Sequence, residues 1–305
     1  MRIILNPMAR HGAGARLRPR IEAELSARGI DFDIVETTRT GHAADLARDA
    51  AAQGVSTIVA AGGDGTVHEV VNGMMAARTP GVTLGVLPIG TGNDFVKLVP
   101  GTATITDACD TLAGGRSAPV DVGLVQWSGG TEYFVNAMGT GIDVEVVRRM
   151  RRVRFVPGGV LYVVALLRAL AVYRPLQIRV RTGADTFEKS IMNLAVCNGP
   201  CIGGAFRICP DARHDDGLLD TCMIEEMPIL RNARMVPRVV RGTHPGHVGV
   251  TMLRGTEVHL SLTDGRPLPF QVDGELREAA DGAAGIHVSL APDRLNVMRG
   301  TAVAA

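Results

Sequence analysis

The stretch Gly62-Gly63-Asp64-Gly65-Thr66 decides the fold of the N-terminal half of this chain. It follows the apolar run Thr57–Ala61 and precedes the apolar-rich run Val67–Met75. A buried strand, a glycine turn and a helix start in this order form a phosphate cradle, because glycine lets backbone N–H groups approach an anion and a helix N-terminus favours negative charge. The order therefore predicts a nucleotide-binding loop.

A plain turn is the alternative interpretation of this loop. Thr66 would then be the N-cap of the following helix, and Glu69, three residues later, would complete a capping box. The loop matches neither the dinucleotide fingerprint G-x-G-x-x-G nor the P-loop pattern, because no lysine follows it to hold phosphates. The five residues alone do not distinguish a nucleotide-binding loop from a plain turn, so the motifs in the rest of the sequence are needed.

Composition limits the class of protein. The 305 residues are enough for two domains, and 32 basic against 31 acidic residues exclude a global attraction for nucleic acid. A hydrophobic content of 46% with 37 glycines suits a soluble, loop-rich α/β protein. Five cysteines without CxxC spacing or a secretory signal favour a reduced, cytoplasmic setting, and Cys197, Cys201 and Cys209 lack the neighbours that a zinc site needs. The apolar strand expected at the N-terminus leaves no room for a targeting segment.

Strands and helices are expected to alternate through the first 95 residues. The expected strands cover residues 2–5, 31–36, 57–61 and 83–87, and helical patterns cover 17–25, 42–53 and 67–77. This βαβ order predicts a mostly parallel sheet. The loops at 6–14, 37–41, 62–66 and 88–94 should then lie at the carboxyl edge of the sheet, where such proteins bind ligands.

Short β-branched runs replace this order after about Val125. We expect strands at 133–137, 176–181, 190–197, 218–224, 248–253, 257–262 and 286–290, which predict an antiparallel β domain with a few helices. The apolar run 159–172 is interrupted by Arg168 and is shorter than the ~20 residues that span a bilayer. We therefore expect it to be a helix packed on the β domain.

The motifs together resemble a known family. GGDGTVHEVVNG (62–73) with LGVLPIGTGNDFVK (84–97), preceded by ILNP (4–7), is similar to the catalytic domain shared by diacylglycerol kinases, sphingosine kinases and bacterial soluble lipid kinases. Asn136–Gly139, Gly203–Asp220 and Val272–Glu275 follow in the order of the bacterial branch, so the resemblance covers essentially the whole chain.

The resemblance implies a two-domain fold. It implies an α/β nucleotide-binding domain with a mostly parallel sheet over residues 1–125 and an antiparallel β-sandwich over 126–290. A tail, 291–305, is expected to return to the first domain. The active site is then expected between the domains.

The resemblance also implies an ATP-dependent lipid kinase that uses Mg2+ and phosphorylates a lipid hydroxyl, foremost that of a diacylglycerol-like acceptor. We expect a cytoplasmic enzyme that meets its lipid acceptor at the membrane surface, without a transmembrane segment or a nucleic-acid partner. A homodimer is left open. The residues that the resemblance assigns to ATP contact are Asn6, Pro7, Met8, Ala9, Arg10, Thr37, Gly62, Gly63, Asp64, Gly65, Thr66, Val67, His68, Glu69, Gly90, Thr91 and Asn93.

Phosphoryl transfer needs a metal to neutralise phosphate charge and a base to accept the proton of the acceptor hydroxyl. Asp64 is the candidate for the magnesium contact, since Mg2+ prefers one or two carboxylates together with phosphate oxygens. By resemblance Glu275 is the general base, with Asp273 as a further catalytic candidate. Asp94 could instead orient the acceptor, and a DGE hairpin turn without catalytic function is the alternative for residues 273–275.

A second metal is implied in the β domain. In bacterial relatives a structural magnesium is held by a carboxylate and neighbouring backbone carbonyls, which correspond here to Asp216 with the carbonyls of Arg213 and Leu218; a plain β-turn is the alternative. The sequence departs from the family after Pro7, where the usual serine is missing, so Arg10 or Arg16 has to supply positive charge. His68 stands where the bacterial branch usually has Asn.

The segment 148–154 holds five arginines in seven positions. It is either a solvated face or a contact for anionic lipid headgroups, and no aromatic residue interleaves it to stack on bases. Two other functions stay open. One is a kinase of a soluble acceptor, because NAD kinases resemble this chain in the GGDGT loop. The other is a nucleotide-binding regulator without catalysis.

Overall fold

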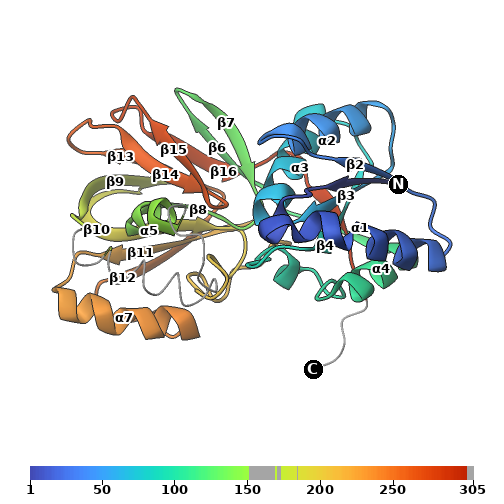
Figure 1. The fold of residues 1–305 in the computed structure, drawn as a ribbon. Helices are drawn as coiled ribbons and strands as arrows, with labels where there is room; N and C mark the ends of the chain where they lie inside the picture. Colours follow the sequence, from blue (N-terminus) through green and yellow to red (C-terminus); the bar gives the residue numbers. More distant parts are fainter. Residues whose placement is uncertain (151–168, 170–172, 184, 301–305) are drawn as a thin grey trace. The chain divides into compact units, whose positions relative to one another are not determined.

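The computed structural model describes residues 1–150, 169, 173–183 and 185–300 (Figure 1). The chain divides into two compact units, of which the first comprises Met1–Asp121 and Pro292–Ala305 and the second Val122–Ala291. The helix expected over 159–172 lies outside the described residues except for Ala169. Within the described part of the chain, no helix has both the length and the hydropathy that a membrane span requires.

Six strands in the order β2-β1-β3-β4-β17-β5 form the sheet of the first unit. The strands are β1 (Arg2–Leu5), β2 (Asp33–Glu36), β3 (Thr57–Gly62), β4 (Thr83–Pro88), β5 (Ser117–Val120) and β17 (Leu295–Met298). The first four are parallel, and β17 is parallel to β4 but antiparallel to β5. The expectation of a mostly parallel sheet is confirmed. Its fifth position is filled by a strand from the C-terminal end of the chain.

Helices cover both faces of this sheet, α2 and α3 on one face and α1 and α4 on the other (Figure 1). The helices are α1 (Ala9–Ala27), α2 (His42–Ala52), α3 (Asp64–Ala77), the 3-10 turn η1 (Val96–Leu98) and α4 (Ile105–Gly114). Ile21 and Leu25 of α1 pack with Leu112 of α4 in one core cluster. On the other face a Cβ on Gly73 of α3 would lie 2.1 Å from Ala44 O, so glycine permits the close approach of α2 and α3.

Two local expectations in this unit are wrong. Helix α3 begins at Asp64, three residues earlier than expected, and its N-cap is Gly63, whose backbone is extended and whose cap has no side-chain hydrogen bond. Thr66 therefore lies inside the helix, and the capping-box interpretation fails. The loop expected over residues 6–14 is shorter, because α1 begins at Ala9 and is interrupted by left-handed residues at Arg10, His11 and Gly12, with φ of 48°, 57° and 83°.

In the described part of the second unit, eleven strands form an antiparallel, curled sheet (Figure 1). The path runs β15-β14-β8-β10-β9-β13-β16-β6-β7, and β11 pairs with both β10 and β12. The strands are β6 (Gly123–Trp127), β7 (Gly130–Phe134), β8 (Ala137–Gly141), β9 (Leu176–Thr182), β10 (Asp185–Cys197), β11 (Leu219–Glu225), β12 (Val250–Gly255), β13 (Glu257–Leu262), β14 (Leu268–Val272), β15 (Glu275–Ala279) and β16 (Ile286–Leu290). The expected antiparallel β domain is confirmed.

The long strand β10 has apolar residues on both of its faces. Leu194 and Val196 belong to a core cluster formed by the strands, whereas Ala195 and Cys197 belong to a second cluster on the opposite side. Successive side chains of a strand point to opposite faces, so a strand buried on both faces is a continuous apolar run. The helices α5 (Ile142–Met150) and α7 (Ile229–Arg241) contribute to the second cluster.

The single strand expected at 133–137 is wrong, because two strands meet there. Strand β7 ends at Phe134 and pairs with β6, whereas β8 begins at Ala137 and pairs with β10 and β14. Val135 and Asn136 form the break between them. The apolar run is continuous in sequence, but its two halves have different partners.

Candidate active site

The loops after β1, β3 and β4 begin side by side at the carboxyl edge of the parallel sheet. Leu5 pairs with Ala61, and Gly62 pairs with Pro88. The Asn6 N–H donates to Ala61 O (2.9 Å), and the Thr37 N–H after β2 donates to Leu5 O (2.9 Å). The four loops expected at this edge therefore start from neighbouring strand ends.

Two glycine backbones touch at the centre of this edge. A Cβ on Gly90 would lie 2.4 Å from Gly63 Cα, and a Cβ on Gly63 would lie 3.1 Å from Gly90 Cα. The Gly90 N–H donates to Gly62 O (3.1 Å), which fixes the two loops against each other. Only glycine allows this contact, and it leaves the N-terminus of α3 at a surface made of backbone. Such a surface suits an anion.

Asp64 lies in the first turn of α3 and contacts the loop after β4. Its Oδ1 accepts hydrogen bonds from the N–H of Asp94 (2.6 Å) and of Phe95 (3.4 Å). A Cβ on Gly92 would lie 2.8 Å from Asp64 Oδ2. The carboxylate therefore stands between the two glycine loops, favourably placed at a helix N-terminus.

Asn93 and Asp94 complete the loop after β4. Asn93 has φ of 49°, a left-handed conformation that Asn tolerates, and its Nδ2 donates to Gly90 O (3.1 Å). Its Oδ1 is buried and accepts no hydrogen bond from any described residue. Asp94 is buried, and its Oδ1 accepts from Lys97 Nζ at 2.8 Å. Lys97 lies in η1, directly after this loop, and is a cation to which the sequence analysis assigned no role.

Asn6 links the first loop to α3. Its Nδ2 donates to Thr66 Oγ1 (3.1 Å), and its Oδ1 accepts from the Met8 N–H (3.0 Å). A Cβ on Gly14 would lie 2.1 Å from Asn6 O, so Gly14 allows α1 to start against this residue. The sequence predicts a glycine-containing loop here, but it does not predict the contact of Gly14 with Asn6.

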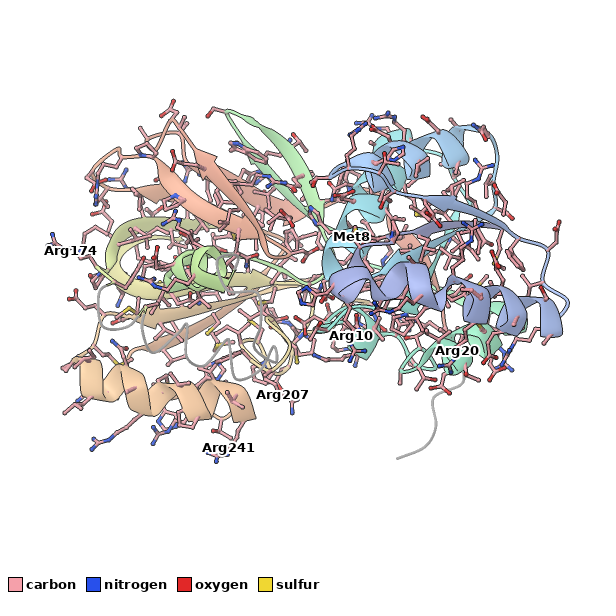
Figure 2. The ribbon with its side chains drawn as sticks, in the orientation of Figure 1. Met8, Arg10, Arg20, Arg174, Arg207 and Arg241 are labelled. Atoms are coloured by element: carbon pink, nitrogen blue, oxygen red, sulfur yellow. The ribbon has the colours of Figure 1, made fainter. Side chains whose placement is uncertain are left out.

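Residues 6–8 connect β1 to α1, and Arg10 follows in the first turn of α1; Figure 2 labels Met8 and Arg10. Met8 is 73% exposed, Arg10 is exposed in the left-handed turn, and Ala9 is buried. Among the described residues Arg10 has no ion-pair partner. The arginine is thus available as a counter-charge for an anion at this edge.

His68 and Glu69 of α3 are engaged within the protein. His68 is buried, and its Nε2 lies 3.4 Å from Asn72 Nδ2. The Glu69 carboxylate accepts from the N–H of Gly41 (2.8 Å) and of Ala43 (3.1 Å), so it caps the start of α2. Glu69 therefore holds α2 against α3, a role that sequence reasoning missed because its partner is another helix.

In the second unit, the carboxylate of Asp273 binds the backbone between β7 and β8. Asp273 and Gly274, with φ of 46° and 87°, form the two-residue turn between β14 and β15. The Asp273 carboxylate accepts three backbone N–H bonds, from Val135 (2.9 Å), Asn136 (3.0 Å) and Ala137 (3.0 Å). Its geometry is that of a structural clamp.

Glu275 is the first residue of β15, directly after this turn, and is half-buried. It pairs with Val272 across the hairpin. The neighbouring turn is held by the bond from the Gly274 N–H to Gln271 Oε1 (2.6 Å), and Gln271 Nε2 donates to Asp143 Oδ2 (2.8 Å). The backbone that carries Glu275 is thus fixed on both sides of the turn.

The loop before β11 contains the other candidate metal residues. Asp216 Oδ1 accepts from the Leu218 N–H (3.1 Å), and its Oδ2 pairs with Arg254. The exposed Arg213 pairs instead with Asp215 (3.3 Å). Burial raises the pKa of the neighbouring Asp220; Arg254 opposes this rise, and the Asp216 carboxylate adds to it. The structure thus brings Asp216 and Leu218 together, but it joins the carboxylate to an arginine.

The buried cysteines pack as small apolar side chains. Burial raises the pKa of Cys197, Cys209 and Cys222, so the thiols stay protonated. Within the described residues no group of three or more His, Cys, Asp or Glu side chains could hold a metal ion. A site made of one carboxylate and backbone carbonyls is not of that kind.

Comparison with known protein families classifies the chain. Residues 1–125 match the diacylglycerol kinase catalytic domain, and residues 136–299 match the YegS C-terminal NAD kinase beta sandwich-like domain. The chain therefore belongs to the diacylglycerol kinase catalytic-domain family, as a YegS-like lipid kinase.

Individual relatives agree over nearly full length. The diacylglycerol kinase of Mycobacterium tuberculosis (strain ATCC 25618 / H37Rv) is 31% identical over 263 residues, covering 84% of this chain and 83% of that protein. The diacylglycerol kinase of Bacillus subtilis (strain 168) is 28% identical over 277 residues, covering 90% and 89%. A crystal structure of a diacylglycerol kinase from Bacillus anthracis str. Sterne has a TM-score of 0.75 at 20% identity, covering 99% of this chain and 97% of that one. This last likeness concerns the fold.

Proposed function

We propose that this lipid kinase transfers the γ-phosphate of ATP to the hydroxyl of a diacylglycerol-like lipid. The relatives named diacylglycerol kinase, similar over nearly full length, support the acceptor class. The observation that supports ATP as the phosphate donor is the contact of Gly63 with Gly90 beside the N-terminus of α3. Backbone N–H groups and a helix N-terminus at one surface are suited to a polyphosphate.

In this proposal the ATP phosphates lie against residues 62–66 and 90–93, and Arg10 supplies positive charge. Asn6 and Thr66 hold the two loops in register, as their hydrogen bond supports. Thr37 starts the neighbouring loop from the end of β2. Glu69 acts indirectly, since its carboxylate holds the start of α2.

Asp64 fits a contact to Mg2+. Its carboxylate stands between the two glycine loops, where phosphate oxygens would complete an oxygen ligand set of the kind this ion prefers. When bound, the ion neutralises charge on the phosphates during transfer. The backbone bonds to Asp94 and Phe95 keep the carboxylate in place.

Glu275 is proposed as the general base that accepts the proton of the acceptor hydroxyl. Asp273 is better supported as the residue that positions this hairpin, because its carboxylate already accepts three N–H bonds. Asp94 is the competing candidate for orienting the acceptor. Its ion pair with Lys97 supports a carboxylate that is held in a fixed position.

A kinase of a soluble acceptor is the second candidate function. The description of the matched C-terminal domain as NAD kinase-like favours it. The two candidates differ in the acceptor of the phosphate, so one assay that offers both kinds of acceptor distinguishes them.

The test is transfer of labelled γ-phosphate from ATP with Mg2+ to a panel of detergent-dispersed lipids. We expect label in diacylglycerol, and NAD and an acceptor-free sample serve as controls. Label in NAD with none in any lipid would move the protein to the second candidate. ATP binding without any labelled acceptor would favour a regulator without catalysis.

We further propose that Asp216 holds a structural Mg2+ with the carbonyls of Arg213 and Leu218. Asp216→Ala is expected to lower the melting temperature and to remove its dependence on Mg2+, because a ligand bound only by the folded state raises stability with its concentration. Thermal unfolding over a magnesium series measures both. Arg254→Met is the matched control, since it removes the ion pair and keeps the carboxylate. If wild type shows no magnesium dependence, the ion pair alone explains the loop.

A further inference from the structure

The outer face of α7 is a row of arginines. Arg231, Arg234, Arg238 and Arg241 follow one another at intervals of three, four and three residues, the spacing that places side chains on one face of a helix. Arg231, Arg234 and Arg241 are exposed, and Arg238 is partly exposed. A basic stripe therefore runs along one side of the helix.

The opposite face of α7 fixes the helix to the β domain. Met235 and Val239 are buried in the core cluster that includes Cys222 and Ile224 of β11. The buried Asn232 donates from Nδ2 to Met227 O at 2.8 Å. Because this face is committed to the core, the arginine stripe is held outward.

The stripe has no acidic counterpart. Helix α7 contains no Asp or Glu, and none of its four arginines forms an ion pair with another described residue. The acids nearest in sequence are engaged elsewhere, Glu225 with Lys189 (2.8 Å) and Glu226 with Ser190 (2.6 Å). Several arginines elsewhere in this unit are paired, for example Arg179 with Glu188 (2.6 Å) and Arg277 with Glu132 (2.6 Å). What distinguishes α7 is that four unpaired arginines follow one another on one helix.

Arg207 extends the stripe beyond the helix. Its N–H donates to Val239 O (3.1 Å), which holds it beside the C-terminal turn of α7. Figure 2 shows Arg207 and Arg241 at this end of the helix. Arg207 is exposed and, among the described residues, also lacks an acidic partner. We name Arg207, Arg231, Arg234, Arg238 and Arg241 the α7 arginine face.

Two large apolar side chains lie exposed at the other end of α7. Ile229 is 56% exposed and Leu230 is 71% exposed. Leu230 precedes Arg234 by four residues, so it shares a face with the arginines. Exposed apolar residues next to a basic stripe match the interfacial region of a bilayer, where headgroups are anionic and the layer below is apolar.

We propose that the α7 arginine face docks the enzyme on an anionic lipid surface. The inference rests on the proposed function, since a lipid acceptor has to be reached in a membrane. Nucleic acid fits less well, because α7 offers no aromatic side chain to stack on bases. Of the arginine run 148–154, the described Arg148 and Arg149 both pair with Glu145, so the uncompensated charge lies on α7 instead.

The experiment is sedimentation of the full-length protein with phosphatidylcholine vesicles that contain phosphatidylglycerol. Sedimentation gives the partition coefficient of the protein between water and vesicles. Loss of one basic residue that contacts the anionic surface is expected to lower this coefficient about fivefold, so the double variant Arg234→Gln, Arg241→Gln should lower it about 25-fold. The loss should shrink as salt is raised, because screening shortens the reach of the charges. The matched control is Arg116→Gln with Arg181→Gln. It makes the same charge change at exposed arginines outside α7 that have no ion pair with a described residue.

The control variant should bind vesicles nearly as well as wild type. Equal binding by the α7 variant and wild type would overturn the proposal, and so would equal losses in the α7 and control variants. A loss of binding to duplex RNA without a loss on vesicles would assign the face to nucleic acid.

A second readout separates this proposal from the kinase assignment. Both variants should phosphorylate a detergent-dispersed acceptor at the wild-type rate, whereas the α7 variant should be slow only on an acceptor embedded in anionic vesicles. If no lipid is phosphorylated in detergent by wild type, the proposed function fails, and the vesicle result stands independently of it.

Discussion

Glu275→Gln is expected to abolish phosphoryl transfer while leaving ATP affinity unchanged. The amide keeps the size of the side chain but cannot accept the proton of the acceptor hydroxyl. General-base catalysis contributes about 10²- to 10⁴-fold, so kcat should fall by about that factor. Labelled-phosphate transfer measures kcat, and calorimetry with ATP measures affinity.

The hairpin itself provides the control for this substitution. Glu278 lies on the same strand, is exposed, and is three residues from Glu275, so its side chain points to the opposite face of the sheet. Glu278→Gln should turn over at the wild-type rate. Unchanged turnover in Glu275→Gln would remove this residue from the base role, and Asp94→Asn would then be the next variant to test. A large loss of ATP affinity would assign Glu275 to nucleotide binding.

The regular parts of the fold were predictable because their signals are local. The run at 57–61 is continuously apolar, as a strand buried on both faces requires, and β3 covers Thr57–Gly62. The start of α3 was misplaced because sequence rules favour a side-chain cap such as Thr66. The structure uses Gly63, whose extended backbone needs no side chain to begin the helix.

The break between β7 and β8 could not be read from its own residues. Its cause is the carboxylate of Asp273, which lies 136 to 138 positions further along the chain and takes up the N–H groups of Val135, Asn136 and Ala137. Glu69 is a similar case, since it caps a helix whose capped residues lie 26 and 28 positions earlier. Residue type predicted that these carboxylates matter. Only the fold shows which donors they serve.

The glycine loops were predictable as a site because their residue type is itself the signal. Gly63 and Gly90 were both expected at the nucleotide, and the contact between their backbones gives the physical reason that a side chain is excluded there. Gly14 and Gly92 exclude side chains in the same way, although neither was among the residues assigned to ATP contact. A glycine count cannot separate close approach from ordinary turn formation.

Asp273→Ala is expected to destabilise the second unit by about 3 kcal/mol or more. Three backbone donors would lose their acceptor, and each unsatisfied donor that is shielded from water costs about 1 to 3 kcal/mol. Alanine is also strained at φ of 46°, which Asp and Asn tolerate. Urea unfolding measures the free energy, and turnover is measured in parallel below the transition.

Asp273→Asn separates a positioning role from a catalytic one. The amide tolerates the same φ and keeps one acceptor oxygen, so a clamp should lose part of its stability and turnover together. Asp281→Ala is the control, because that carboxylate accepts N–H bonds from Ala283 and Ala284 in an exposed turn, where water can replace it. A stable Asp273→Asn variant without turnover would contradict the clamp and return Asp273 to the chemistry. Joint losses, absent in the Asp281 variant, would mean that Asp273 serves catalysis by holding the hairpin from which Glu275 projects.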